Sequence, residues 1–144
     1  MDKTALEGTC RPGETLVFVY GTSMSGEPNH GLMTGARFIT EGQTQAEFDL
    51  VDLGGFPAMV EGGVTRVNGE IYAVSAGGVR FMDEVEDHPE YFRRTSVTLQ
   101  DGPQVNCYLL PPAHGRPFPR IRSGSWRRRA DSENARPEPL GPGE

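Results

Sequence analysis

Strand-like patterns dominate the order of hydrophobic and polar positions along this chain. The apolar run 16–20 predicts a buried strand, and the alternation over 36–53 predicts two strands joined near 41–43. Apolar residues at helical spacing predict one helix, at about 78–87. The remaining predicted elements are a short helical segment at 27–33 and strands at 58–60, 67–74, 91–100 and 104–110.

The first predicted strand ends in Tyr20 and runs into a tight turn, Gly21-Thr22-Ser23. A strand, a turn and a short helix in succession present unpaired backbone N–H groups at one point in space. Such a point favours a carboxylate or a developing oxyanion. Many junctions of this kind bind nothing, so the turn by itself leaves both interpretations open.

The predicted helix carries a carboxylate on its apolar side. Its hydrophobic arc consists of Val79, Phe81, Met82 and Val85. At about 100° per residue, Glu86 falls inside this arc, between Val79 and Met82. Three other acids fall outside it: Asp83, Glu84 and Asp87. Burial raises the pKa of a carboxyl group and prepares it for general acid/base work. The alternative is that Glu86 frays into water at the helix end or pairs with Arg93 or Arg94.

A strand follows the helix after the break at His88-Pro89. Alternation with period two places Tyr91 and Arg93 on one face of this strand. Tyr91 is therefore a candidate to accompany Glu86 at a site, and ordinary packing in the sheet is the alternative.

Composition narrows the class of protein. A chain of 144 residues fits one domain, and its 19 glycines and 12 prolines with 35% hydrophobic residues favour a turn-rich β protein. The net charge of −6 argues against nucleic acid as a partner. No apolar stretch is long enough for a membrane span, and residues 1–7 do not read as a signal peptide. The widely separated Cys10 and Cys107 are expected to be reduced, in a cytoplasmic protein.

The domain is expected to cover 15–127, followed by a disordered polar tail at 128–144. The arginine run 127–129 is expected to be solvated. The three histidines show no metal-binding spacing, and no glycine-rich cofactor loop or nucleophile motif is present, so we expect neither a metal nor a cofactor.

Several short motifs, taken together and in order, resemble those of one family. The segment 17–22 is similar to the first strand and Tyr-Gly-Ser/Thr-Leu loop of the γ-glutamylcyclotransferase-like superfamily, in particular its AIG2-like and γ-glutamylamine cyclotransferase branch. Met82-Asp83-Glu84-Val85-Glu86 resembles the family's Leu-Asp-x-x-Glu. Further matching segments are 26–30, 55–59, 67–72, 91–93 and 121–126.

The resemblance implies an α+β fold, a small mixed-strand β-barrel with flanking short helices. It implies release of 5-oxoproline and a free amine from a γ-glutamyl amine or amide, with Glu86 as the general acid/base and no cofactor. Tyr20, the turn Gly21-Thr22-Ser23 and Tyr91 would bind this small-molecule substrate.

Three positions depart from the family pattern: Ser23, where Leu is usual, Asp87, where Gly is common, and Ser125, where Asp is usual. Ser23 and Asp87 motivate the alternative, a non-catalytic module of the same fold that binds a small carboxylate. The identity of the leaving amine and the oligomeric state do not follow from the sequence.

Overall fold

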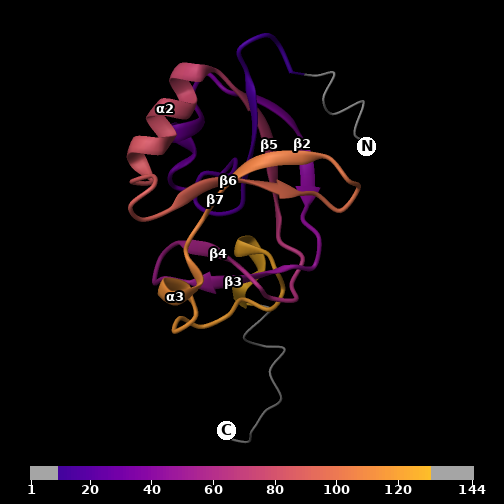
Figure 1. Ribbon diagram of the computed structural model, residues 1–144, viewed down its shortest axis with the longest axis vertical. Helices are drawn as coiled ribbons and strands as arrows, with labels where there is room; N and C mark the ends of the chain where they lie inside the picture. The colour runs from indigo at the N-terminus through magenta and orange to yellow at the C-terminus, as the bar shows by residue number, and fades with distance from the viewer. Residues whose placement is uncertain (1–9, 131–144) are drawn as a thin grey trace, which may run out of the picture.

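The computed structural model describes residues 10–130, in which seven strands form one mixed sheet with short helices beside it (Figure 1). The strands are β1 (Thr15–Val19), β2 (Arg37–Gln43), β3 (Phe48–Asp52), β4 (Pro57–Glu61), β5 (Asn68–Val74), β6 (Arg93–Thr98) and β7 (Gln104–Leu109). The α-helices are α2 (Ala76–Val85) and α3 (Pro112–Gly115), and the 3-10 helices are η1 (His30–Met33) and η2 (Trp126–Arg128).

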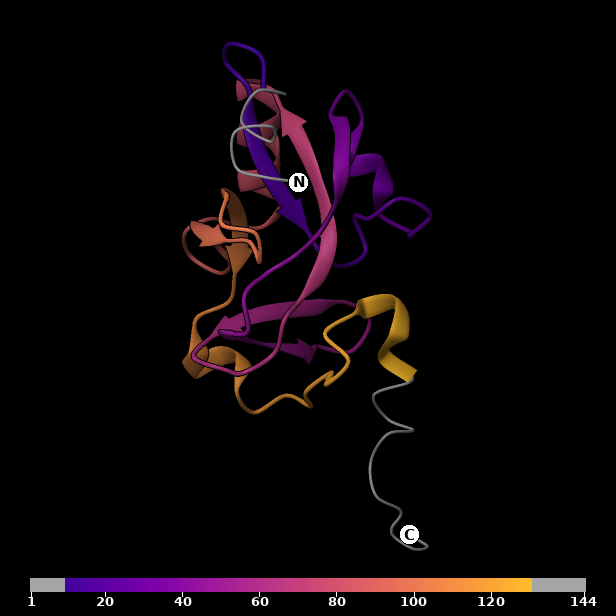
Figure 2. The same cartoon turned by 90° about the vertical axis from the view of Figure 1, so that its right-hand side faces the viewer.

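The sheet combines parallel and antiparallel pairs. Its strand order is β2-β5-β1-β7-β4-β3, and β6 pairs with β7 outside this path. Strand β7 runs parallel to β1 and β4, whereas the other pairs are antiparallel. Figure 2 shows the long β1–β5 pair above the β3–β4 pair. The predicted α+β class with a mixed sheet is confirmed.

The sheet curves until the ends of β2 and β6 meet. Thr44 and Leu99 form an isolated antiparallel bridge, and the Gln100 N–H donates to the Gln43 carbonyl at 2.8 Å. Within residues 10–130, no longer ladder joins these two strands. The run β2-β5-β1-β7-β6 therefore encloses a shared interior, which is closed by a short contact at one end.

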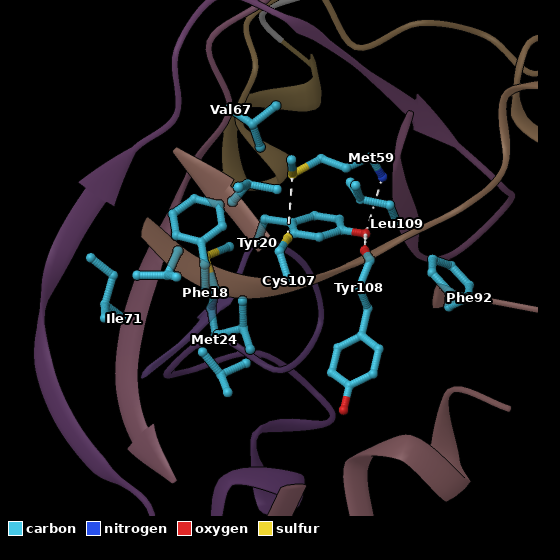
Figure 3. Packing of buried hydrophobic residues seen from close by; sticks show 14 of the residues in the cluster. Phe18, Tyr20, Met24, Met59, Val67, Ile71, Phe92, Cys107, Tyr108 and Leu109 are labelled. Atoms are coloured by element: carbon cyan, nitrogen blue, oxygen red, sulfur yellow. Dashed lines mark hydrogen bonds between the residues drawn. The ribbon is translucent and has the colours of Figure 1, made fainter. Parts of the chain in front are cut away.

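Strand β1 is the central strand of this run, between β5 and β7. Its residues Leu16–Val19 are all buried, as the unbroken apolar run predicted. Figure 3 shows how Phe18, Tyr20, Met59 and Cys107 pack together there. Both cysteines of the chain are free.

The structure moves several predicted boundaries. Residues 41–43 belong to β2 and do not form the predicted turn, because Gly42 lets that strand pass close to Ile71; a Cβ at Gly42 would lie 2.8 Å from Ile71 Cδ1. Helix α2 ends at Val85, and its N-cap Ser75 accepts a 3.1 Å hydrogen bond from the Gly78 N–H. Of the predicted helical segment 27–33, only η1 is helical.

In the part of the chain that the structure describes, no helix has the length and hydropathy of a membrane span. The predicted tail boundary falls near the end of this part, and residues 131–144 lie outside it.

Candidate active site

The turn after β1 keeps its backbone N–H groups unpaired. Its carbonyls are occupied: Gly21 accepts from the Met24 N–H at 3.1 Å, and Thr22 accepts from the Asn29 N–H at 2.8 Å. The Ser23 carbonyl accepts from His30 Nδ1 at 2.9 Å. Within residues 10–130, the N–H groups of Gly21, Thr22 and Ser23 donate to no other group. The geometry therefore provides a set of donors for an anionic oxygen.

Gly21 allows this turn to pack against the start of β4. A Cβ at Gly21 would lie 2.6 Å from both Cγ and Cδ of Pro57, closer than real side chains approach. The glycine is thus required by the close approach of two chain segments.

The hydroxyl group of Tyr20 is engaged in the core. It donates to the Tyr108 carbonyl at 2.7 Å and accepts from the Met59 N–H at 3.0 Å (Figure 3). Burial raises the pKa of Tyr20 well above its ordinary value. Tyr20 therefore ties β1 to β4 and β7, and only its ring is left to form a wall of the site.

Glu86 occupies the C-cap position of α2, where its N–H donates to the Met82 carbonyl at 2.9 Å. Its carboxylate makes no hydrogen bond or ion pair within residues 10–130. Burial alone raises its pKa to about 6. A pKa raised toward neutrality is the property that a general acid/base needs.

The alternative in which Glu86 pairs with an arginine is wrong. Arg94 binds Asp83 in a forked pair, with Nε–Oδ1 at 2.9 Å and Nη2–Oδ2 at 3.2 Å. Arg93 Nε donates to the Pro89 carbonyl at 3.3 Å. Asp83, which the helical wheel left outside the apolar arc, thus takes the partner that Glu86 lacks.

A small cavity of about 70 Å³ brings the turn and Glu86 together. Its lining includes all of the predicted site residues except Tyr91. The lining residues are Phe18, Val19, Tyr20, Gly21, Thr22, Ser23, Phe56, Pro57, Met82, Glu86, Phe92 and Tyr108.

Tyr91 does not join this cavity. Its side chain is 41% exposed, and its ring packs edge-on against Phe92 at 4.9 Å between centroids. Strand β6 begins only at Arg93, and the Phe92 N–H donates to the Glu86 carbonyl at 3.2 Å. Because the chain is still turning at Tyr91, the period-two argument does not apply, and Phe92 points inward instead.

Sequence reasoning missed a second carboxylate beside the turn. Glu70 is 3% exposed, and its Oε1 accepts from the Ser25 N–H and from the Tyr72 hydroxyl, both at 2.9 Å. Burial acts to raise its pKa, but these hydrogen bonds outweigh burial and lower it. A charged residue inside the apolar stretch 67–74 was the available signal.

Arg127 also differs from the expectation of a solvated run, because its guanidinium group pairs with carboxylates of the folded domain. Its Nη2 lies 3.3 Å from Glu70 Oε2, and its Nε lies 3.4 Å from Glu27 Oε2. Arg129 stacks over the Trp126 ring at 4.0 Å. Arg127 and Arg129 thus both contact the folded domain.

The fold and the site together define a small domain in which an unpaired, desolvated carboxyl group and a turn of backbone donors line the same cavity. The model of the family "Gamma-glutamyl cyclotransferase, AIG2-like" matches residues 17–128. The chain belongs to this family.

Relatives and solved structures agree with this assignment. A Vibrio cholerae protein provisionally named gamma-glutamylcyclotransferase is 36% identical over 111 residues, which cover 77% of this chain and 94% of that protein. Human gamma-glutamylaminecyclotransferase is 37% identical over 94 residues, covering 59% of this chain and 61% of the human protein. The crystal structure of a mouse AIG2-like protein superposes with a TM-score of 0.65 at 32% identity, covering 76% of this chain and 87% of that one.

Proposed function

We propose that the protein is a γ-glutamyl cyclotransferase that converts a γ-glutamyl amine or amide into 5-oxoproline and a free amine. The observation that carries this proposal is the position of Glu86, whose unpaired carboxyl group lines the same cavity as the turn Gly21-Thr22-Ser23. Membership of the family supports the reaction class.

The reaction is an intramolecular acyl transfer. The substrate's α-amine attacks its own γ-carbonyl carbon, a C–N bond closes the five-membered ring, and the bond to the leaving nitrogen breaks. The α-amine loses a proton and the leaving nitrogen gains one, so no water is consumed. Holding both groups in one molecule supplies effective molarities of ~10⁵–10⁸ M once the geometry is fixed.

Glu86 is proposed to carry this proton between the two nitrogens. With its pKa raised to about 6, the group is mostly ionised at neutral pH and accepts the proton of the attacking amine. The same carboxyl group then returns the proton to the leaving nitrogen. The N–H groups of Gly21, Thr22 and Ser23 would hold the α-carboxylate or the carbonyl oxygen. Tyr91 does not line this cavity, so the proposal assigns it no step.

A second candidate function is binding of a small carboxylate without turnover. The cavity of about 70 Å³ is smaller than the ~300–1,000 Å³ that ligand sites usually span, which favours a small ligand. A larger substrate would extend beyond this volume or displace a lining side chain. Phe56 is the exposed member of the lining, at 41%, and it follows two glycines with positive φ, Gly54 and Gly55.

Product analysis separates the two functions. The purified full chain is incubated with a panel of γ-glutamyl amines and amides, and 5-oxoproline and the free amine are quantified.

Glu86→Gln should lower the rate ~10²–10⁴-fold, because the amide keeps the shape but cannot exchange the proton. The matched control is Glu84→Gln, an exposed position on the same helix, which should be nearly silent. More than a third of the wild-type rate in Glu86→Gln would remove Glu86 from its role, and binding of 5-oxoproline without any turnover would favour the second function.

A further inference from the structure

The buried carboxylate of Glu70 is organised around the segment that follows the donor turn. Both of its oxygens contact Ser25: Oε1 accepts from the Ser25 N–H and Oε2 from the Ser25 hydroxyl, each at 2.9 Å. The Tyr72 hydroxyl adds a third donor at 2.9 Å. A carboxylate that is 3% exposed needs such donors, because burying an unpaired charge is costly. The local structure therefore keeps Ser25 in one place.

Arg127 reaches the same segment from near the far end of the domain. It donates to the Ser25 carbonyl and lies 3.3 Å from Glu70 Oε2 and 3.4 Å from Glu27 Oε2. Its own position is fixed, since it follows the buried Trp126 in η2. One guanidinium group thus joins β5, the segment after the turn and the C-terminal part of the domain.

The donor turn is held on two sides, and its own donors take no part in either set of contacts. On one side Asn29 and His30 occupy the carbonyls of Thr22 and Ser23. On the other side Glu70 and Arg127 hold Ser25 and Glu27. All of these contacts use the carbonyls of the turn or the residues that follow it. The N–H groups of Gly21, Thr22 and Ser23 therefore stay available to a ligand.

We infer that Glu70 and Arg127 are positioning residues, which align the N–H groups of the turn 21–23 for the α-carboxylate of the substrate. This inference rests on the proposed function and names how the substrate's charge is recognised. Neither residue lines the cavity, so each acts through the turn.

The test compares two ligands that differ only in the carboxylate. 5-Oxoproline carries it, and 2-pyrrolidinone is the same lactam without it. Calorimetry should show that the wild-type protein prefers 5-oxoproline by about tenfold or more, which is the effect of one charge-assisted hydrogen bond. Glu70→Gln and Arg127→Ala should reduce this preference to about threefold or less. A general loss of stability would weaken both ligands alike and leave their ratio unchanged.

Matched controls come from neighbouring positions. Glu41→Gln removes the same charge from the residue that faces Glu70 across the β2–β5 pair, at an exposed position. Arg122→Ala removes an exposed arginine from the same C-terminal segment. Both should keep the wild-type preference. Arg127→Lys keeps the positive charge without the forked guanidinium group. It should therefore retain part of the preference for 5-oxoproline that Arg127→Ala loses.

The outcomes distinguish the inference from the proposed function. An active wild-type protein whose preference for 5-oxoproline survives in Glu70→Gln and Arg127→Ala overturns the positioning role alone. A wild-type protein that neither turns over γ-glutamyl compounds nor binds 5-oxoproline overturns both. If Glu70→Gln does not fold, the Arg127 variants decide, because the Arg127 side chain is 39% exposed whereas Glu70 is buried.

Discussion

The Tyr108 hydroxyl donates a 2.6 Å hydrogen bond to Asp83 Oδ1, which joins strand β7 to the last turn of helix α2. Arg94 of β6 donates two hydrogen bonds to the same carboxylate. Burial acts to raise the pKa of Asp83, but the bonds from Arg94 and Tyr108 outweigh burial and lower it. The charged end of the helix is thus fixed to the sheet three residues before Glu86, which determines where the candidate acid/base lies.

Replacing Asp83 should therefore damage both stability and turnover. Asp83→Asn leaves the Arg94 guanidinium without its charge partner, and hydrogen bonds to charged groups contribute about 1.5–3 kcal/mol each. We expect the free energy of unfolding to fall by about 1–3 kcal/mol, measured by urea denaturation, and kcat to fall because Glu86 loses its fixed position. The control is Glu84→Gln on the exposed side of α2. Unchanged kcat in a destabilised Asp83→Asn would show that this network does not position Glu86.

The ionised Glu86 side chain should lower the free energy of unfolding at neutral pH. Its folded-state pKa, raised to about 6, lies above its ordinary value of 4.5. A raised pKa favours folding below pH 4.5, and this contribution is lost as the pH rises through 6. The difference corresponds to about 2 kcal/mol at 1.36 kcal/mol per unit of pKa. Glu86→Gln should therefore be more stable than the wild type at pH 8 by up to about 2 kcal/mol, and about equal to it at pH 4.

Denaturation curves at the two pH values check this prediction. A Glu86→Gln protein with the same advantage at pH 4 and pH 8 would show that the gain comes from packing and not from the charge. A less stable variant at pH 8 would show that the Glu86 carboxylate has a favourable partner in solution.

Local patterns were enough to predict the turn and the carboxylate of the candidate site. The apolar run of β1 and the glycine after Tyr20 mark a strand and a turn whatever surrounds them, and the helical period turned Glu86 inward. The same wheel was wrong about Phe81 and Val85, which are 49% and 46% exposed. Helix α2 packs through the narrow stripe of Val79 and Met82, and the width of such a stripe is decided by what it packs against.

The contacts that hold the site could not be predicted from local sequence patterns. Glu70 and Arg127 are 57 residues apart, and neither belongs to a motif that announces the other. Asp83 looked solvent-facing because a helical wheel does not show that Tyr108 and Arg94 lie beside it. Phe92 replaced Tyr91 at the cavity because the strand starts two residues later than the alternation suggests. Each of these contacts depends on how distant segments are placed in the fold, and the periodicity of the sequence does not predict that placement.

The backbone conformation at Asp87 bears on one departure from the family pattern, in which Gly is common at this position. Asp87 has a φ of +57°, a left-handed conformation that glycine adopts without strain and a side chain with a Cβ resists. Asp87→Gly and Asp87→Ala remove the same exposed charge and differ in the Cβ. We expect Asp87→Gly to be the more stable of the two by about 1 kcal/mol. Equal melting temperatures would mean that this position relaxes out of the left-handed region.

Ser23 offers a test of the donor turn itself. Ser23 lines the cavity and its carbonyl is held by His30, so a larger side chain should reshape the wall without moving the backbone. Ser23→Leu restores the residue usual in the family, and burying a leucine side chain contributes about 1.5–3 kcal/mol. For a substrate that contacts it, KM should change about ten- to hundredfold, and the order of preference among γ-glutamyl amines should shift. Ser23→Ala, which only removes the hydroxyl group, should keep the wild-type order. A change below twofold for every compound tested would place side chain 23 outside the substrate's reach, and the turn would then not be the binding surface even if Glu86 carries the proton.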